Sequence, residues 1–283
     1  TSDWDPIIPN PNAGEMCDAI LSAMTKTDER DQVVDFTRGY YTSSQGVIGS
    51  ADAAAISGIG DLNAAGTKVA LQSGTTSDIY AQENLADATI QAYTDFPSVI
   101  AAVNNGDADY ALGDAPVLAL EGTLLTTFSD ETFGIAVRED SGDLLDALDV
   151  ALTAMIESGT YDSIFGDWFE GAVVLTDDRT ADTATAYPAL TEGTTLHSAL
   201  QSGSLRFCTD PYYPPFENLD ADGNAEGFDV DIGNAIVSQL SGQYTQPAPD
   251  TTTKIGLLNP LTGPIAVYAP PFTWAAQAAI DDL

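Results

Sequence analysis

Three residues combine side-chain types and local settings that suit the binding of a small charged molecule. Arg30 is one of only 8 basic residues, and its guanidinium can pair with a carboxylate through two parallel hydrogen bonds. Thr76 precedes an expected helix over residues 77–85, and a helix N-terminus favours an anion. Asp114 follows an expected strand and offers a negative charge, but one aspartate among 32 is uninformative by itself, and only the block of residues around it singles it out. These residue types suit noncovalent recognition of opposite charges.

Other kinds of site find little support. The single histidine, His197, lies at the edge of an expected linker, where we expect it to be solvated. The many aspartates do not follow the spacing of a calcium loop. We therefore expect no metal, no cofactor and no catalytic residue.

The charge of the chain limits its partners. The 283 residues include 43 acidic and 8 basic ones, for a formal net charge of −35, and 44% are hydrophobic, enough to bury a core. Such a surface repels nucleic acid and anionic lipid, so we exclude both as direct partners. We hypothesise a saline habitat, because salt screens self-repulsion. The alternative is an ordinary acidic secreted protein.

The two cysteines and the hydropathy pattern add two expectations. Cys17 and Cys208 fall in expected neighbouring strands at different heights, so we expect both to be buried free thiols. No run of about 18 apolar residues occurs that could span a membrane, and no N-terminal signal sequence is present in the chain.

Strands and helices are expected to alternate, which favours sheets covered by helices. Helices are expected over 77–85, 97–104, 144–156 and 161–169, and strands over 34–37, 68–72, 89–93 and 110–113. Residues 176–195 are rich in Thr, Asp and Ala and are expected to form a linker.

Several blocks, in their order and spacing, resemble the type II periplasmic binding proteins for amino acids (solute-binding protein family 3, which includes glutamine, histidine and arginine binders). The resemblance covers residues 1–170 and 205–240 and implies an α/β fold of two lobes, each an open, mostly parallel sheet flanked by helices. The matching blocks are Trp4-Asp-Pro-Ile-Ile-Pro, 18–30, Val34-Asp-Phe-Thr, Gln72-Ser-Gly-Thr-Thr-Ser, 106–109 with Asp114, Gly134-Ile-Ala-Val-Arg and Gly159-Thr-Tyr-Asp.

The resemblance implies roles for the polar residues. A free amino acid is a zwitterion, and Arg30 would hold its α-carboxylate together with Thr76. Asp114 would hold the α-ammonium group from the other lobe. The backbone of Ser22 and the side chain of Thr25 would add polar contacts.

The resemblance also implies a place for the ligand side chain. Trp4 and Tyr213 match the aromatic pair that sandwiches this side chain in the family. Asp210 would meet a distal amine or guanidinium, which tilts the expected ligand toward basic amino acids. Ala23 stands where family members often have a second small polar residue.

The order of the segments departs from the family. Residues 205–240 resemble its first strand and helix, yet they follow the rest of the chain. We expect them to complete lobe 1 in cis; the alternative is the start of a second copy in a tandem array. Residues 254–269 resemble the start of a type I branched-chain amino-acid-binding protein.

The expected division of the chain follows from this order. Lobe 1 takes 1–49, 133–172 and 205–242, lobe 2 takes 50–132, residues 173–204 form a linker, and 243–283 form a second linker and the type I fragment. The crossings between the lobes are expected near Val47–Gly49 and Phe133–Val137.

The resemblance implies a function without chemistry. We expect an extracytoplasmic protein, periplasmic or secreted at the cell surface, that captures a free amino acid, polar or basic, in the cleft between its lobes. Hinge closure would retain the ligand, and an ABC transporter permease would receive it from the monomeric protein. The alternatives are a cyclohexadienyl-dehydratase-like enzyme on the same scaffold and the ligand-sensing module of a receptor.

Overall fold

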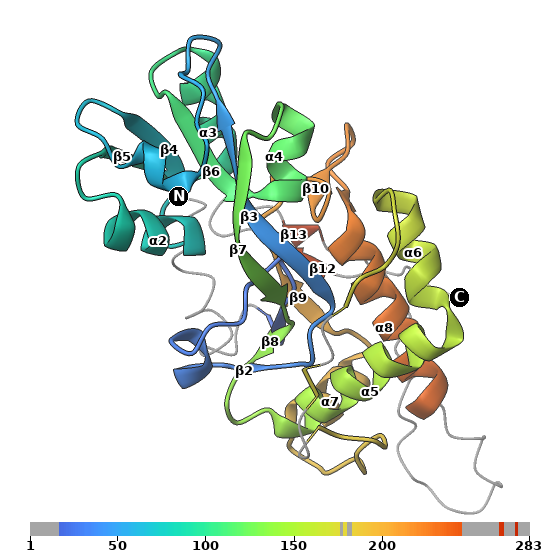
Figure 1. Cartoon of the computed structure of the whole chain (residues 1–283). Helices are drawn as coiled ribbons and strands as arrows, with labels where there is room; N and C mark the ends of the chain where they lie inside the picture. The colour runs from blue at the N-terminus through green and yellow to red at the C-terminus, as the bar shows by residue number, and fades with distance from the viewer. Residues whose placement is uncertain (1–16, 176–177, 180–182, 245–265, 269–274, 277–283) are drawn as a thin grey trace, which may run out of the picture.

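Two mixed β-sheets organise the chain (Figure 1). The computed structural model describes residues 17–175, 178–179, 183–244, 266–268 and 275–276. Trp4 and most of the expected type I fragment lie outside these residues. None of the helices in the described ranges has both the length and the apolar character that a membrane span requires.

The first sheet has six strands and brings the late segment of the chain beside an early one. Its strands, in spatial order, are β13 (Ala275–Ala276), β12 (Ala266–Tyr268), β9 (Arg206–Cys208), β1 (Ala19–Ile20), β8 (Ala136–Val137) and β2 (Asp35–Phe36). Strand β9 runs parallel to β1 on one side and to β12 on the other. The segment after residue 204 therefore lies inside this sheet.

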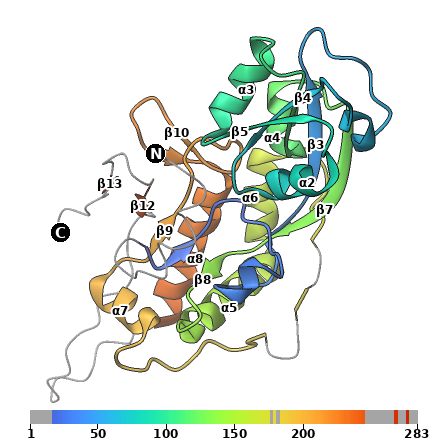
Figure 2. The ribbon, with the colours of Figure 1, turned by 90° about the vertical axis from the view of Figure 1, so that its left-hand side faces the viewer.

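Four helices lie against the six-stranded sheet (Figures 1 and 2). They are α5 (Gly142–Ser158), α6 (Thr160–Trp168), α7 (Thr195–Ser202) and α8 (Phe228–Tyr244). Helix α5 buries Leu144, Leu148, Leu152 and Met155, which recur at helical spacing. It ends at Gly159, whose φ of 79° is left-handed and suits glycine. The buried residues of these helices join one large core that also includes residues of the second sheet. A separate buried cluster consists of Cys17, Ile20, Met24, Val34, Ala136 and Cys208.

The second sheet has five strands and its own helices. Its spatial order is β5 (Thr89–Tyr93), β4 (Lys68–Gln72), β6 (Tyr110–Asp114), β3 (Tyr41–Gly49) and β7 (Thr126–Phe133). The helices are α2 (Thr76–Asn84), α3 (Phe96–Asn104) and α4 (Ala115–Glu121). Thr75 and Asp95 cap α2 and α3 by accepting backbone N–H groups, which fixes where these helices begin.

Two 3₁₀ turns and a two-stranded hairpin complete the described chain. The 3₁₀ turns are η1 (Arg30–Gln32) and η2 (Ile59–Leu62), and β10 (Asn218–Leu219) pairs with β11 (Ala225–Glu226) as a separate hairpin.

The chain passes between the sheets at two adjacent points. It leaves the six-stranded sheet after β2 and enters the other at β3, so residues 37–40 form one crossing; residues 134–135 form the return between β7 and β8. The N–H groups of Thr37 and Tyr40 donate to the carbonyls of Ile135 and Phe133, both at 2.9 Å. The predicted crossing at residues 47–49 is wrong, because these residues pair with 110–112 inside the five-stranded sheet.

The crossings also explain the mixed direction of the strands. Parallel pairs join β9 to β1 and β4 to β5 and β6. Strands β3, β7 and β8, next to the crossings, pair antiparallel. Parallel strands were expected to predominate, but they share each sheet with these antiparallel ones.

Helix α7 occupies part of the segment that we expected to be a linker. Thr194 caps it by accepting the N–H of His197, and Leu196, Ala199 and Leu200 form its buried face. This cap and apolar spacing are sufficient for a short helix on the core.

The expectation of two free thiols is wrong. Cys17 and Cys208 form a disulfide with their Cα atoms 5.6 Å apart. The chain bends at Asp18, so Cys17 does not continue along β1, and the assumed difference in height does not hold. The disulfide links β9 to the chain entering β1.

Candidate functional site

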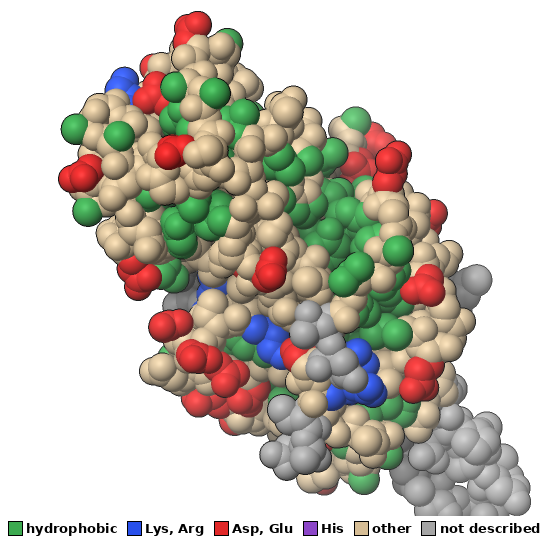
Figure 3. Space-filling model, viewed as in Figure 1, with side chains coloured by type: hydrophobic (Ala, Val, Ile, Leu, Met, Phe, Trp, Pro, Cys, Tyr) green, Lys and Arg blue, Asp and Glu red, His purple; other side chains and the backbone are tan. Residues whose placement is uncertain are grey.

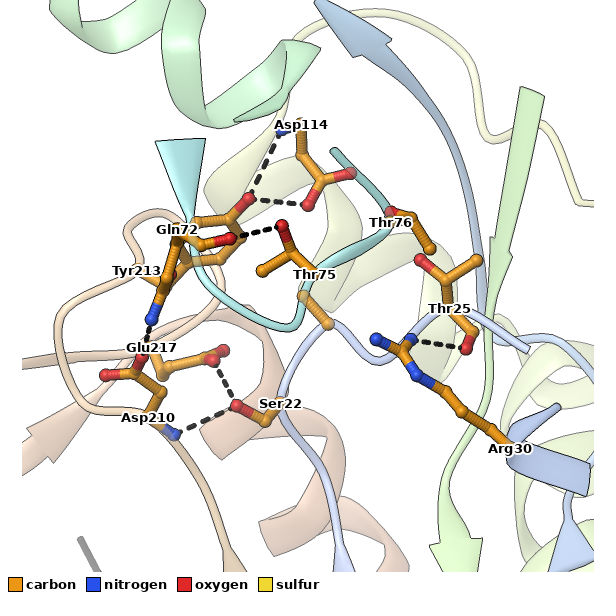
Figure 4. A pocket seen from close by; sticks show the side chains of 11 residues that line it. Ser22, Thr25, Arg30, Gln72, Thr75, Thr76, Asp114, Asp210, Tyr213 and Glu217 are labelled. Atoms are coloured by element: carbon orange, nitrogen blue, oxygen red, sulfur yellow. Dashed lines mark hydrogen bonds between the residues drawn. The ribbon is translucent and has the colours of Figure 1, made fainter. Parts of the chain in front are cut away.

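A small cavity lies where the two sheets meet (Figure 4). One part of its wall comes from the loop after β1 and from the segment between β9 and β10, and the other from β4, the start of α2 and the end of β6. The lining residues are Ser22, Ala23, Thr25, Arg30, Gln72, Thr75, Thr76, Asp114, Asp210, Tyr213 and Glu217.

The strand directions explain why these side chains meet. The lining residues follow the carboxyl ends of β1 and β9 in one sheet, and end or follow β4 and β6 in the other. In open α/β sheets this edge is where ligands bind, because loops there are held by the strands while their side chains stay free to contact a ligand.

Arg30 reaches both sides of the cavity. Its Nη1 donates to the carbonyl of Thr25 at 2.8 Å and its Nη2 to the carbonyl of Gly74 at 3.4 Å, in the loop before α2. The side chain is buried, and burial lowers the pKa of the guanidinium, while the charges of Glu131 and Asp114 oppose this shift. A buried guanidinium near carboxylates stays charged and can accommodate an anion.

Asp114 lies at the end of the site away from Arg30 (Figure 4) and accepts hydrogen bonds from neutral donors. Tyr213 Oη donates to its Oδ2 at 2.6 Å, and Gln45 Nε2 donates to its Oδ1 at 2.9 Å. Burial raises the pKa of Asp114 well above its ordinary value, and the charge of Glu131 adds to this. A cation at this carboxylate would offset the cost of its burial.

Two further carboxyl groups face the cavity. Asp210 accepts from Gln72 Nε2 at 3.0 Å, so this pair also joins the two sheets. Glu217 accepts from Ser22 Oγ at 2.6 Å. Burial raises the pKa of both acids.

The structure brings together seven of the eight predicted site residues. Ser22, Thr25, Arg30, Thr76, Asp114, Asp210 and Tyr213 line the same cavity, and Trp4 lies outside the described residues. Asp114 and Tyr213 come from different sheets, and their hydrogen bond closes one end of the site.

Sequence reasoning missed three polar lining residues. Gln72 and Thr75 belong to a quoted block, but only Thr76 was singled out from it. Glu217 follows Pro215-Phe216 in the segment that resembles the opening of the family. The feature that could have pointed to Glu217 was its position three residues after Pro214, close to the predicted site residue Tyr213.

The cavity is nearly closed. Its free volume is about 30 Å³, far below the roughly 300–1,000 Å³ typical of pockets that hold a small molecule. The contacts of Tyr213 with Asp114 and of Gln72 with Asp210 draw its walls together. Any ligand of amino-acid size therefore requires the walls to move apart.

A metal centre is not built into the described part of the chain. No group of three or more His, Cys, Asp or Glu side chains within these ranges is arranged to hold a metal ion.

Several known proteins are similar in sequence to this chain. The chain is 31% identical over 164 residues to the "ABC transporter arginine-binding protein 1" of Escherichia coli (strain K12), covering 54% of this chain and 66% of the relative. It is 30% identical over 178 residues to a "probable histidine-binding protein" of Neisseria gonorrhoeae, covering 59% of this chain and 65% of the relative. The chain thus spans slightly less than two thirds of these relatives.

A solved structure supports the same fold. A crystal structure of an ancestral amino acid-binding protein, described as a precursor of cyclohexadienyl dehydratase, matches with a TM-score of 0.56 and 35% sequence identity, over 59% of this chain and 75% of the other. The prediction of a two-lobe α/β fold of the type II periplasmic binding proteins is confirmed.

One family model matches most of the chain. The sequence model of the "bacterial extracellular solute-binding proteins, family 3" matches residues 1–171 and 205–259, on both sides of the segment that contains α7. The chain therefore belongs to family 3 of the bacterial extracellular solute-binding proteins.

Proposed function

We propose that this protein captures a free amino acid with a cationic side chain in the cavity between its sheets. Arg30 pairs with the α-carboxylate, and Asp114 pairs with the α-ammonium group. The observation that carries the proposal is that a buried guanidinium and a buried carboxylate line one cavity from different sheets. A zwitterion carries a carboxylate that can pair with the guanidinium and an ammonium group that can pair with the carboxylate.

The charge balance of the cavity favours a ligand with one more positive charge. Its wall holds one guanidinium and three carboxyl groups, of which Glu217 is hydrogen-bonded to Ser22, so Asp114 and Asp210 remain opposite the single Arg30. After Asp114 pairs with the ammonium group, Asp210 remains for the side chain of arginine, lysine or ornithine. Its present partner, the Gln72 amide, is neutral and can be displaced.

Binding requires a hinge motion. The two crossings at 37–40 and 134–135 are short and lie side by side, so rotation about them separates the sheets while each stays intact. A ligand that touches both sheets stabilises the closed state, because it binds that state better than the open one.

The transport role follows from the family and from the names of the relatives. An extracytoplasmic binder of this kind delivers its ligand to an ABC transporter permease, and the binder itself performs no chemistry. We propose that the protein acts as a monomer in this role.

A ligand screen tests the proposal directly. Purified protein is melted with the twenty amino acids and ornithine, and isothermal titration calorimetry follows for those that stabilise it. A ligand at about 100 times its Kd adds about 3 kcal/mol, which raises Tm by roughly 5–10 °C. Stabilisation by arginine, lysine or ornithine supports the proposal. Stabilisation by glutamate or aspartate alone would contradict the charge argument.

A dehydratase is the second candidate, because the matched ancestral protein is described as a precursor of cyclohexadienyl dehydratase. The cavity holds no His, but burial raises the pKa of Asp114 and of Glu217, so either could act as a general acid. Incubation with a cyclohexadienyl acid and detection of the aromatic product by absorbance distinguishes the two. Product formed by wild type and lost in Glu217→Gln would favour the enzyme.

A further inference from the structure

The turn at Ser22–Ala23 in the cavity wall has an unfavourable backbone. Ala23 has a φ of +43°, in the left-handed region that L-residues other than Gly, Asn and Asp seldom adopt. It is 5% exposed and lines the cavity between Ser22 and the Thr25–Arg30 segment. Something other than the local sequence must therefore hold this turn in place.

Two carboxyl groups from the late segment of the chain accept hydrogen bonds from this turn and hold it in place. Asp229 Oδ2 accepts the N–H of Ala23 at 2.7 Å, and it also accepts the hydroxyl of Tyr40 at 2.8 Å. Glu217 Oε1 accepts the hydroxyl of Ser22 at 2.6 Å, and Ser22 Oγ in turn accepts the N–H of Asp210 at 2.9 Å. Each residue of the turn is thus fixed by one carboxyl group.

The backbone around Gly227 brings the two acids together. Gly227 lies so close to Phe216 that a Cβ would stand 2.2 Å from the Phe216 carbonyl oxygen, and its φ is +135°. The N–H of Asp229 donates to the Phe216 carbonyl at 2.9 Å. This close approach places the start of α8 directly against the residue before Glu217.

The two acids can be buried together only if they share a proton. Each is 1% exposed, and Oε2 of Glu217 and Oδ1 of Asp229 have no other partner. The side chains interact with each other, and burial raises the pKa of Glu217 well above its ordinary value and that of Asp229 to about 7. A proton on Glu217 lets this carboxyl group donate to Asp229, so that one proton can give each of the two leftover oxygens a partner.

We propose that Glu217 and Asp229 are a positioning pair that holds the Ser22–Ala23 turn in its left-handed form, so that the wall carrying Ser22, Thr25 and Arg30 is set for the ligand. The pair acts through the turn and not by pairing with the ligand. This inference rests on the proposed function for its ligand, but the geometry of the turn can be measured without one.

Leucine and amide substitutions separate the roles of shape and hydrogen bonding. Glu217→Leu and Asp229→Leu keep approximate size but remove the acceptors, and we expect the Kd for arginine to rise about 10- to 100-fold. Glu217→Gln keeps an acceptor for Ser22 and offers an amide N–H to Asp229 in place of the carboxyl proton, so it is expected to bind arginine at least tenfold more tightly than Glu217→Leu.

A glycine at position 23 is the decisive variant. Glycine adopts a positive φ without cost, so Ala23→Gly in the Asp229→Leu background is expected to recover at least part of the lost affinity. Asp231→Leu is the matched control, because Asp231 lies on the same helix and accepts from Trp168 Nε1 at 2.7 Å, away from the turn. It is expected to lower Tm without weakening arginine binding.

A readout without ligand distinguishes failure of this inference from failure of the proposed function. Amide hydrogen exchange measured by NMR is expected to show faster exchange at Ala23 in Asp229→Leu, but not in Asp231→Leu or Glu217→Gln. If wild type does not bind arginine yet this pattern holds, only the ligand assignment fails. Slow exchange at Ala23 in Asp229→Leu, or no recovery with glycine in a folded protein, overturns the positioning role.

Discussion

The Tyr213 hydroxyl donates a hydrogen bond of 2.6 Å to Oδ2 of Asp114 and accepts the backbone N–H of the same residue at 3.2 Å. Tyr213 follows β9 in the six-stranded sheet, whereas Asp114 ends β6 in the other. Each sheet thus supplies one partner of a bond that closes the cavity. The phenol contacts the carboxylate that we assign to the ligand ammonium group, so it competes with the ligand or shares this carboxylate with it.

Removing that hydroxyl is expected to open the ligand-free protein. In Tyr213→Phe the ring keeps its edge contact with Phe96, at a centroid distance of 4.9 Å, but the bond to Asp114 is lost. We expect a larger radius of gyration by small-angle X-ray scattering without ligand, and a radius equal to wild type with saturating arginine. Tyr212→Phe, at an exposed neighbouring residue, is the control. Equal radii for Tyr213→Phe and wild type without ligand would contradict the role of this bond.

Arg30 is expected to contribute most of the affinity for the ligand carboxylate. Losing one partner of a buried charge pair costs about 2–5 kcal/mol, so Arg30→Ala should raise Kd about 30-fold or more. Arg30→Lys keeps the charge but loses the planar fork, and we expect roughly a tenfold rise. Calorimetry measures both, with the exposed Lys68→Ala as the control. Binding by Arg30→Ala at wild-type strength would refute the assignment.

The disulfide is expected to stabilise the junction of the early and late segments. Cys17 and Cys208 are 191 residues apart in sequence, and closing so long a loop in the unfolded chain contributes about 2–5 kcal/mol. Cys17→Ser with Cys208→Ser should lower the free energy of unfolding by this amount in a urea titration. A reducing agent should act on wild type but not on the double variant. Equal stability of the two proteins would show that the disulfide adds nothing.

The sequence predicted which residues line the cavity better than it predicted the connections around it. Arg30, Thr76 and Asp114 stand in blocks whose residue order encodes a strand end followed by a loop, so their neighbours in space followed from the fold. Glu217 and Asp229 were missed because their role depends on a turn at Ala23 whose positive φ leaves no trace in an alanine.

The errors have local physical causes. The crossing was placed at 47–49 because Val47-Ile-Gly looked like a passage between lobes, whereas β3 pairs on both sides and the true crossing is four residues of irregular backbone. The cysteines were judged too far apart because both were assumed to lie in straight strands. A bend at Asp18 is set by tertiary contacts, including the bonds between Asp18 and Arg206, and these contacts join residues 188 positions apart.

Stability is expected to fall as the pH rises from mildly acidic to neutral. Burial raises the pKa of Asp149 to about 6 and that of Asp229 to about 7, above their unfolded values. The folded protein therefore binds more protons than the unfolded chain, and the stabilisation present below about pH 4 is lost as the pH passes these values. Tm should be higher near pH 5 than near pH 8.

A single substitution checks the sign of this pH effect. Asn at position 149 does not titrate, and its carbonyl can still accept the N–H of Arg38, which now donates to Asp149 Oδ1 at 2.7 Å. Asp149→Asn should therefore lose less Tm than wild type between about pH 5 and pH 7. Asp162→Asn, at an exposed position, is the control. A wild-type Tm that rises over this range would reverse the conclusion.

Salt is expected to raise the melting temperature. The net charge is −35. Figure 3 shows acidic side chains spread over the visible face of both lobes. At about 0.01 M ionic strength the screening length is roughly 30 Å, so these charges repel across the molecule, whereas at about 1 M it is roughly 3 Å.

Because salt also strengthens apolar burial, an upward trend alone does not prove screening. Replacing the exposed Glu121, Asp162 and Asp167 by their amides removes three charges and leaves the core intact. If repulsion is the cause, this variant melts higher than wild type at low salt and approaches it at high salt; parallel curves would assign the effect to burial instead.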